Sequence, residues 1–383
     1  MNSIATPAWR LTADCIWNSF RASGKRHLIL TGRRNAGKTT LLAKLLSAMP
    51  AEGPVPGLTS WAAPGCGVFL RENPTGRTVQ VGRFAPDLPE GEPRMRPVSE
   101  AFRSFGVSAL RRCRQAPGEW VAIDEVGFLE TDCPPYCAAL RDLMEQKRLL
   151  VVVRKQPLPF LQELCHRRDA FCLDLDAPFG RVGCVIMASG LGKRFGGNKL
   201  MAEFSGAPLI QRTLDATAGV FARRIAVTRH RDVAELCRRQ NVPVLLHSQP
   251  CRSDTVRLGL SALLAPDQRW RAPTDGPLTG CLFCPGDQPL LRWQTVAGLT
   301  LAAVAEPDAV WRAAWQGRAG APVLFPAWAF PALQSLPQGQ GGGAVIRQFP
   351  ERVRCLPVQE ARELVDVDTP QQLKALCAEL KCE

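Results

Sequence analysis

The stretch Gly32-Arg-Arg-Asn-Ala-Gly37-Lys38-Thr39 decides the fold of the first half of this chain. It has the spacing G-x-x-x-x-G-K-[ST], follows the apolar run 27–31 and precedes the helix formers of 41–46. Glycines let a loop turn its N–H groups toward a phosphate, and the N-terminus of the next helix adds positive potential. The sequence therefore predicts a strand, a phosphate-binding loop and a helix, which begin an α/β nucleotide-binding domain.

The residues of this loop have separate predicted roles. Lys38 neutralises the β- and γ-phosphate oxygens, and Thr39 offers its hydroxyl to Mg²⁺. The residues that we expect around a bound ATP or GTP are Gly32, Asn35, Ala36, Gly37, Lys38, Thr39 and Thr40. The sequence does not decide between the two nucleotides.

An acidic pair ends a second apolar run, Val121-Ala-Ile-Asp124-Glu125. A P-loop site needs a carboxylate at the end of a neighbouring strand to hold the magnesium side of the site, and Asp124 fits this role. Glu125 fits the role of a catalytic residue that orients or deprotonates the attacking water. The alternative is an ordinary acidic strand end.

The motifs of the first half resemble those of the small nucleoside-triphosphatase family named after thermostable and cancer-related members. Asp124, Glu125, Gly127 and Glu130 match the D-E-[IV]-G-x-x-E stretch of that family, and the resemblance extends over roughly residues 26 to 176. It implies slow, broad hydrolysis of nucleoside triphosphates. Residues 50 to 119 carry no motif that we could interpret.

The second half begins with an apolar run, 182–188, that breaks into glycines and bases. Gly190 and Gly192 allow close backbone approach to a triphosphate, and Arg194 and Lys199 are placed to neutralise it and the leaving pyrophosphate. The alternative is a basic surface loop.

Three carboxylates follow later in the chain. Asp287 ends the apolar run that starts at Gly280, and Asp366 and Asp368 lie on one face of an extended segment. Nucleotidyl transfer needs Mg²⁺ at the α-phosphate, so all three are candidate metal ligands. Pro370 then opens a last helix, to about Leu380. Each acidic motif alone could instead be a helix cap or a turn.

The second half resembles the molybdenum cofactor nucleotidyltransferases, more closely the cytidylyltransferase branch. The matching motifs are Ala188-x-Gly190-x-x-x-Arg194-Phe195-Gly196-x-x-Lys199-Leu200, Gly286-Asp-Gln-Pro289, Gly320-Ala-Pro-Val-Leu-Phe325 and Asp366-Val-Asp368-Thr-Pro370. The resemblance implies a Rossmann-like domain that transfers CMP from CTP to the terminal phosphate of molybdopterin and releases pyrophosphate. It carries over Asp287 and Asp368 as magnesium ligands, and Arg194, Lys199 and Asp287 as catalytic residues.

The resemblance also bears on the nucleotide. Ser253 and Thr255 stand at the offsets of the nucleotide-side segment of that family, although Cys251 replaces its usual glycine. Guanylyl-transferring relatives typically carry paired glycines where this chain has Ala188-Ser189, which favours CTP.

The acceptor stays open. The family usually has a Gly-Asp-x-Gly-Ala-Arg stretch where this chain has Gly339-Gln340-Gly-Gly-Gly343-Ala344, without the Asp and the Arg. A modified molybdopterin or another phosphorylated small molecule would fit. A different alternative is an assembly factor that uses P-loop hydrolysis to deliver cofactor to a client molybdenum hydroxylase.

The whole-chain properties agree with two α/β domains. A chain of 383 residues exceeds the usual size of one core, and we expect a P-loop domain over 1–178 and a nucleotidyltransferase domain over 179–383. The formal charge of +13 is spread along the chain without a nucleic-acid-binding motif, so we expect small polyanionic substrates and no nucleic acid. With no membrane segment and no secretory signal visible, we expect a cytoplasmic protein whose cysteines are mostly free thiols, Cys281-x-x-Cys284 among them as a buried strand end.

Overall fold

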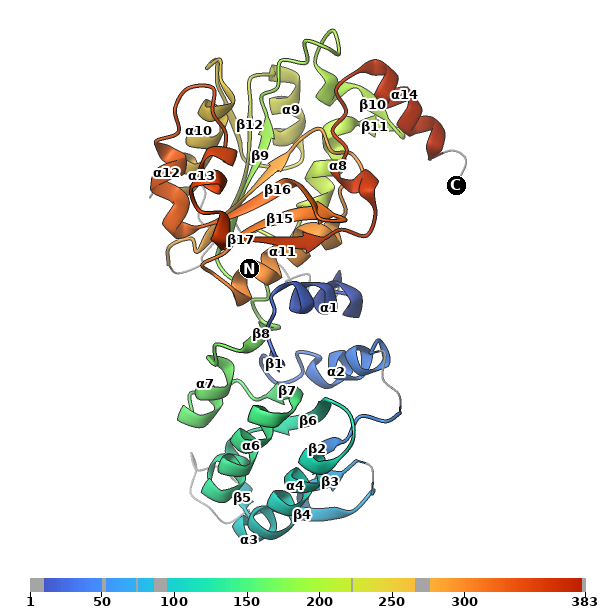
Figure 1. Cartoon of the computed structure of the whole chain (residues 1–383), viewed down its shortest axis with the longest axis vertical. Coiled ribbons are helices and arrows are strands. Elements are labelled where there is room, and N and C mark those ends of the chain that lie inside the picture. The colour runs from blue at the N-terminus through green and yellow to red at the C-terminus, as the bar shows by residue number, and fades with distance from the viewer. Residues whose placement is uncertain are drawn as a thin grey trace. The chain divides into compact units, whose positions relative to one another are not determined.

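Residue contacts divide the chain into two compact units, and each is described by itself (Figure 1). The computed structural model describes residues 10–49, 53–73, 75–85, 95–221, 223–265 and 276–380. Gly24–Pro178 form the P-loop unit, and the residues from Phe179 onward form the C-terminal unit together with those before Gly24.

The N-terminal helix differs from the sequence prediction, which placed residues 1–178 in the first domain. Helix α1 (Ala13–Ala22) packs against α11 (Trp293–Ala305) and β17 (Val353–Pro357) of the C-terminal unit. Its Ile16 and Phe20 are fully buried, and Ser19 donates its hydroxyl to the Gly298 carbonyl at 3.1 Å. An amphipathic pattern shows that one face of a helix is buried but not which domain buries it.

The described strands of the P-loop unit form one sheet of eight. In spatial order they are β5 (Met95–Pro97), β4 (Thr78–Phe84), β3 (Gly67–Glu72), β2 (Gly57–Ala63), β6 (Trp120–Val126), β7 (Arg148–Val153), β1 (His27–Thr31) and β8 (Ala170–Asp174). The strands from β2 to β8 in this order are parallel, as expected for an α/β domain. Residues 50 to 119, in which the sequence shows no motif, contribute β2 to β5, and these strands pair antiparallel.

Helices cover this sheet on two faces. They are α2 (Lys38–Ser47), α3 (Ser99–Ala101), α4 (Val107–Gln115), α5 (Phe128–Thr131), α6 (Pro134–Gln146) and α7 (Pro159–Cys165), with a π-helical turn η2 (Phe102–Gly106) before α4. Helix α2 contacts β1 and β7, whereas α4 contacts β2 and α6. The main core lies on the α4 side, where Leu58, Ile123 and Val151 pack with Leu110.

The described strands of the C-terminal unit form a sheet of seven and a short hairpin. The sheet order is β13 (Val244–Leu246), β12 (Arg223–Thr228), β9 (Val182–Ala188), β14 (Gly280–Pro285), β16 (Arg318–Pro326), β15 (Val310–Trp315) and β17, and the hairpin is β10 (Glu203–Phe204) with β11 (Ala207–Pro208). Strands β13, β12, β9 and β14 are parallel, but β16 is antiparallel to both of its neighbours. The predicted α/β class is confirmed, with mixed rather than purely parallel sheets.

Helices also flank the second sheet. They are α8 (Leu209–Ala216), α9 (Arg231–Arg239), α10 (Arg252–Leu264), α11, α12 (Phe330–Gln334), α13 (Gly343–Gln348) and α14 (Pro370–Glu379), with 3₁₀ turns η3 (Lys199–Met201), η5 (Ala327–Ala329), η6 (Pro350–Arg352) and η7 (Ala361–Leu364). The predicted last helix is present, and Thr369 caps it by accepting the Gln372 N–H at 3.2 Å. Within the described ranges, no helix is both long and apolar enough to span a membrane.

Candidate functional site

The P-loop joins β1 to α2 as predicted. The Lys38 side chain is 7% exposed, and its Nζ donates to the carbonyls of Gly32 and Arg33 at 3.1 and 3.0 Å. Gly37, the N-cap of α2, has a φ of 86°, which a side chain would strain. The loop therefore curls around the ammonium group of Lys38.

The side chains of Thr39, on α2, and Asp124, on β6, lie in contact. The Thr39 hydroxyl donates to Oδ1 of Asp124 at 3.3 Å, and burial raises the pKa of Asp124 above its ordinary value. Thr40 is exposed beside Thr39, and Asn35 and Ala36 lie in the loop itself. The predicted nucleotide and metal residues of the first half are thus gathered at one edge of the sheet.

Glu125 has a partner that we did not predict. Arg154 Nη2 lies 2.6 Å from Glu125 Oε1, and Arg154 Nε lies 2.9 Å from it. Arg154 directly follows β7, which lies between β1 and β6 in the sheet. The sequence pattern does not show that β7 lies between the two motif strands.

The acidic residue that ends the D-E-x-G-x-x-E motif has a structural role. Glu130 is 3% exposed and its Oε2 accepts the Gly127 N–H at 2.7 Å, which fixes the turn after β6. Burial raises the pKa of Glu130 to about 7. This carboxyl group holds the segment that follows Asp124 and Glu125.

The outer side of the P-loop contacts a cluster of charged side chains at the end of β8. Asp176 accepts the Arg33 N–H at 2.9 Å and pairs with Lys155 at 3.0 Å. Lys155 also pairs with Asp174, at 2.6 Å. This basic and acidic cluster attaches the outer side of the P-loop to the end of β8.

The C-terminal unit has its own charged centre at the carboxyl end of β9 and β14. Lys199 Nζ lies 2.7 Å from Asp287 Oδ2 and 2.9 Å from Asp368 Oδ1. Arg194 reaches Oδ2 of Asp368 at 2.7 Å. Burial alone would lower the pKa of Lys199, but these ion pairs raise it, and the Lys199 hydrogen bond lowers the pKa of Asp368. Four predicted site residues are therefore joined in one cluster.

Asp366 lies at the side of this cluster. Partial desolvation of its carboxyl group, followed by the nearby charge of Asp287, raises the pKa of Asp366. The Val367 N–H between the two aspartates donates to the Asp287 carbonyl at 2.9 Å, which fixes the extended segment against the end of β14.

Backbone and buried polar contacts shape the glycine loop. Gly192 has a φ of 59°, and a Cβ there would lie 2.0 Å from the Gly197 carbonyl oxygen, so the loop requires glycine. The carbonyl of Ala188, the last residue of β9, accepts the Thr228 hydroxyl at 2.8 Å. His230 Nε2 lies 2.8 Å from the Gly190 carbonyl oxygen.

The two residues predicted to contact the nucleotide from the start of α10 are buried. Ser253 and Thr255 in the first turns of α10 are only 0% and 2% exposed. Ser253 Oγ accepts the Gly339 N–H at 3.2 Å, so it links α10 to the glycine-rich loop. A helix alternates buried and exposed positions within each turn, and the motif offset did not show that these two face inward.

A small cavity of about 70 Å³ lies next to the glycine-rich loop. Apolar side chains and glycines make up most of its wall, and Arg252 is its charged member. The lining residues are Met187, Arg252, Val256, Phe283, Pro285, Ala321, Val323, Phe325, Leu333, Gly342, Gly343 and Ile346.

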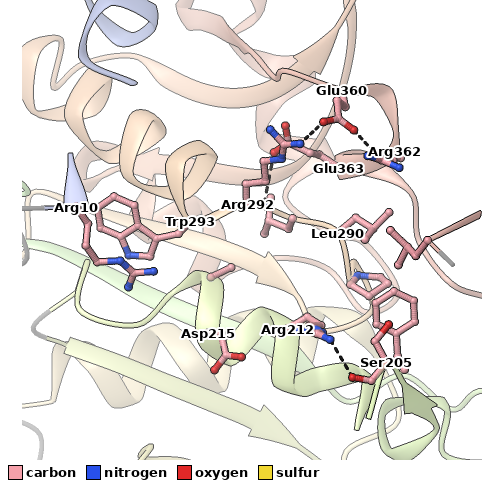
Figure 2. A pocket seen from close by; sticks show the side chains of 15 residues that line it. Arg10, Ser205, Arg212, Asp215, Leu290, Arg292, Trp293, Glu360, Arg362 and Glu363 are labelled. Carbon is pink, nitrogen blue, oxygen red and sulfur yellow. Dashed lines mark hydrogen bonds and ion pairs between the residues drawn. The ribbon is translucent and has the colours of Figure 1, made fainter. Parts of the chain in front are cut away.

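A larger pocket of about 460 Å³ lies between α8 and the start of α11 (Figure 2). Figure 2 shows Arg10 against Trp293, where its guanidinium carbon is 4.6 Å from the ring centroid. Glu360 pairs with both Arg292 and Arg362. These arginines therefore lie on carboxylates or a ring, and the contact of Arg10 with Trp293 joins the N-terminal segment to α11.

The cysteines do not form a metal site in the described part of the chain. No group of three or more His, Cys, Asp and Glu there is arranged to hold a metal ion. Cys281 and Cys284 are fully buried in β14, and burial raises the pKa of each thiol well above its ordinary value.

Two domain-family models match this chain. The model of the NTPase family matches residues 75–177, and that of the MobA-like NTP transferase domain matches 184–353. The first match includes Asp124, Glu125 and Arg154 but begins after the P-loop, and the second ends before Asp366. Both resemblances drawn from the motifs are confirmed at the level of these domains.

The chain is also similar to several known proteins over part of its length. The cancer-related nucleoside-triphosphatase of Homo sapiens is 27% identical over 172 residues, which cover 38% of this chain and 85% of that protein. Its homologue in Mus musculus is 27% identical over 161 residues, with the same coverage. A nucleotidyl transferase from Methanothermobacter is 20% identical and covers 53% of this chain and 99% of its own, with a TM-score of 0.42. The molybdopterin-guanine dinucleotide biosynthesis protein A of Archaeoglobus fulgidus is 16% identical and covers 52% of this chain and all of its own, with a TM-score of 0.40.

Proposed function

We propose that the C-terminal unit transfers CMP from CTP to the terminal phosphate of a molybdopterin-type acceptor, and that the P-loop unit hydrolyses ATP or GTP. The observation that carries the transfer is the Lys199 ammonium group, which holds Asp287 and Asp368 together beside the glycine loop. The choice of CTP rests on Ala188-Ser189 in that loop.

The side chains present at both sites fit Mg²⁺. This ion prefers oxygen ligands, and the carboxylates of Asp287 and Asp368 already converge on one cation. In the P-loop unit the Thr39 hydroxyl and the Asp124 carboxylate lie 3.3 Å apart, close enough to hold one metal ion between them. When bound, the metal would neutralise phosphate oxygens, and Asp366 would complete the acidic surroundings of the transfer site.

The basic residues of the transfer site have two sets of partners in this proposal. Arg194 and Lys199 pair with Asp368, and a bound triphosphate would compete with this carboxylate for them. An acceptor phosphate oxygen forms a bond to the α-phosphorus, the bond from that phosphorus to the bridging oxygen breaks, and pyrophosphate leaves. A phosphate monoester is already anionic near neutral pH, so the reaction needs no general base.

A second candidate is transfer to another phosphorylated acceptor. The 339–344 loop lacks the Asp and Arg of the related family, and Arg252 is the charged side chain on the wall of the nearby cavity. An acceptor with a smaller apolar body and one anionic group would suit this wall.

The test uses the full chain with Mg²⁺, each of CTP, GTP and ATP, and molybdopterin, and it measures pyrophosphate release. We expect release with CTP, its loss in Asp287→Asn, and its retention in Lys38→Ala. Phosphate release from ATP or GTP should show the opposite pattern. No pyrophosphate with any nucleotide would disprove the transfer to molybdopterin, and a screen of other phosphorylated acceptors then tests the second candidate.

A further inference from the structure

An aromatic pair lies on the surface of the P-loop unit, outside both sites described above. Trp61 of β2 and Phe69 of β3 stand directly opposite each other in the antiparallel register. Their rings stack with centroids 5.8 Å apart and planes at 23°. Trp61 is 40% exposed, and the Arg71 guanidinium carbon is 5.8 Å from its ring centroid. An exposed ring beside an arginine is a surface on which a planar aromatic group can stack.

The register places this pair on the same face of the sheet as the P-loop. Thr59 is the partner of Asp124 between the parallel strands β2 and β6, so their side chains share a face, and Trp61, two residues on, shares it too. Asp124 contacts Thr39 of α2 on that face. Leu58 neighbours Thr59, so its side chain lies on the opposite face of the sheet, where it packs into the core on the α4 side.

The pair also lies close to the predicted catalytic carboxylates. Two residues of strand bring Trp61 roughly 7 Å beyond Thr59. Between them, Ser60 Oγ accepts the Glu125 N–H at 3.1 Å and donates to the Glu125 carbonyl at 3.2 Å. This reciprocal contact fixes β2 against the Asp124–Glu125 segment, so the aromatic pair has a defined position next to it.

The charge of this face suits an anionic ligand. Arg71, Arg83 and Arg96 are exposed on it, since Arg83 is opposite Gly67 and Arg96 is opposite Arg83. Among the described residues of β2 to β5, Glu72 is the one carboxylate, and it lies on the other face, paired with Arg112 at 2.7 Å. The aromatic face therefore offers stacking and positive charge, with the Asp124 carboxylate at its P-loop side.

We infer that the aromatic face, comprising Trp61, Phe69, Arg71 and Arg83, is a second nucleotide site that stacks the base of a mononucleotide and holds its phosphate. By the roles that such residues have in P-loop enzymes, Lys38, Thr39 and Asp124 of this chain would hold the β- and γ-phosphates of the triphosphate. The aromatic face lies on the far side of Asp124 from the P-loop. A base stacked on this face would therefore belong to a second nucleotide molecule and not to the triphosphate held by the P-loop. A mononucleotide fits better than a strand, because strands are bound by successive stacking rings and Trp61 offers one open ring.

The test measures binding of AMP, GMP, CMP and UMP to the full chain by calorimetry. We expect saturable binding that survives Lys38→Ala and weakens five- to hundredfold in Trp61→Ala, because stacking on one aromatic ring contributes that much. Trp61→Phe should retain most of the affinity and Arg71→Ala should lose part of it. The matched control is Trp328→Ala, which removes a tryptophan packed on Phe349 with Arg352 4.8 Å from its ring, in the other unit.

Two results would overturn this inference. One is equal monophosphate binding by the parent and Trp61→Ala, with circular dichroism confirming that both are folded. The other is Trp61-dependent binding of an oligothymidylate of eight residues without Trp61-dependent binding of any monophosphate. Neither result bears on pyrophosphate release by the C-terminal unit.

Discussion

Arg154 holds Glu125 by two contacts to a single carboxylate oxygen, at 2.6 and 2.9 Å. The strand that precedes Arg154 lies between the P-loop strand and the strand of Asp124, so the backbone at Arg154 reaches the same sheet edge as the phosphate loop and the predicted water-activating carboxylate. We expect the guanidinium group to orient Glu125 and to face the γ-phosphate when nucleotide is bound.

Arg154→Ala should therefore lower kcat for ATP or GTP hydrolysis about 100-fold, the usual contribution of a positioned acid or base, with little change in KM. Arg154→Lys should retain part of the parent's kcat because it keeps a positive charge. The loss of kcat in Arg154→Ala should be present over the whole pH range. Steady-state phosphate release measures both. Arg141→Ala is the matched control, because Arg141 pairs with Glu163 at 2.7 Å away from the P-loop. A variant with raised KM and unchanged kcat would instead give Arg154 a role in binding.

Lys199→Met should reduce pyrophosphate release about 100-fold, since the ammonium group is the one contact shared by Asp287 and Asp368 and is placed to neutralise developing charge. The residual activity of Lys199→Met should also fall more than that of the parent protein when the pH is lowered. Lys199 lowers the pKa of Asp368, so its removal raises that pKa, and the acid limb of the rate profile moves to higher pH. Lys193→Met, in the same loop and exposed, is the control. An unshifted acid limb would show that Asp368 need not be charged.

Glu130 predicts a pH dependence of stability in the P-loop unit. Its pKa is raised from 4.5 to about 7 by burial, so between these values the folded state binds more protons than the unfolded state. Stability then falls as pH rises through this window, by about 3 kcal/mol in total. Glu130→Gln, which keeps an acceptor for the Gly127 N–H, should remove this term. The measurement compares the urea midpoints of parent and variant at pH 5 and pH 8, and an equal difference at both would contradict the prediction.

Motifs with fixed spacing were predictable because their chemistry requires local geometry. The P-loop with its flanking strand and helix, and the strand that ends at Ala188, follow from glycines and apolar runs that act within ten residues. The sequence also identified Lys199, Asp287 and Asp368, but not that one ammonium group joins them. That contact depends on the order of β9 and β14 in the sheet and on the segment around Val367 returning to it.

Other features depended on the tertiary structure alone. The contact of Arg154 with Glu125 depends on β7 lying between β1 and β6. Ser253 has the right offset for a nucleotide contact but is turned inward, because it packs under the glycine-rich loop. The stretch that holds Trp61 has no phosphate motif, so the sequence pattern carried no signal for the aromatic face.

Ser189 and His247 support a last prediction, on the glycine loop. His247 Nδ1 accepts the Gln249 N–H at 3.1 Å, so a neutral ring carries its proton on Nε2 and donates it to Ser189 Oγ at 2.7 Å. Ser189 then donates to the Val227 carbonyl at 3.0 Å. This chain of hydrogen bonds fixes the start of the loop.

Each of Ser189→Ala and His247→Ala should raise KM for the triphosphate about fivefold, as expected for one lost hydrogen bond, and kcat should change less. The KM of the double variant should be no higher than that of the single variant with the larger effect, because both changes break the same chain of hydrogen bonds. Burial lowers the pKa of His247, so the folded state favours the neutral ring. Protonation of Nδ1 in the folded protein removes the acceptor of the Gln249 N–H, so this contact is lost as pH falls through the lowered pKa of His247. The KM of the parent should rise in that range while the KM of His247→Ala stays flat, and parallel KM profiles for the two proteins would rule out this role of His247.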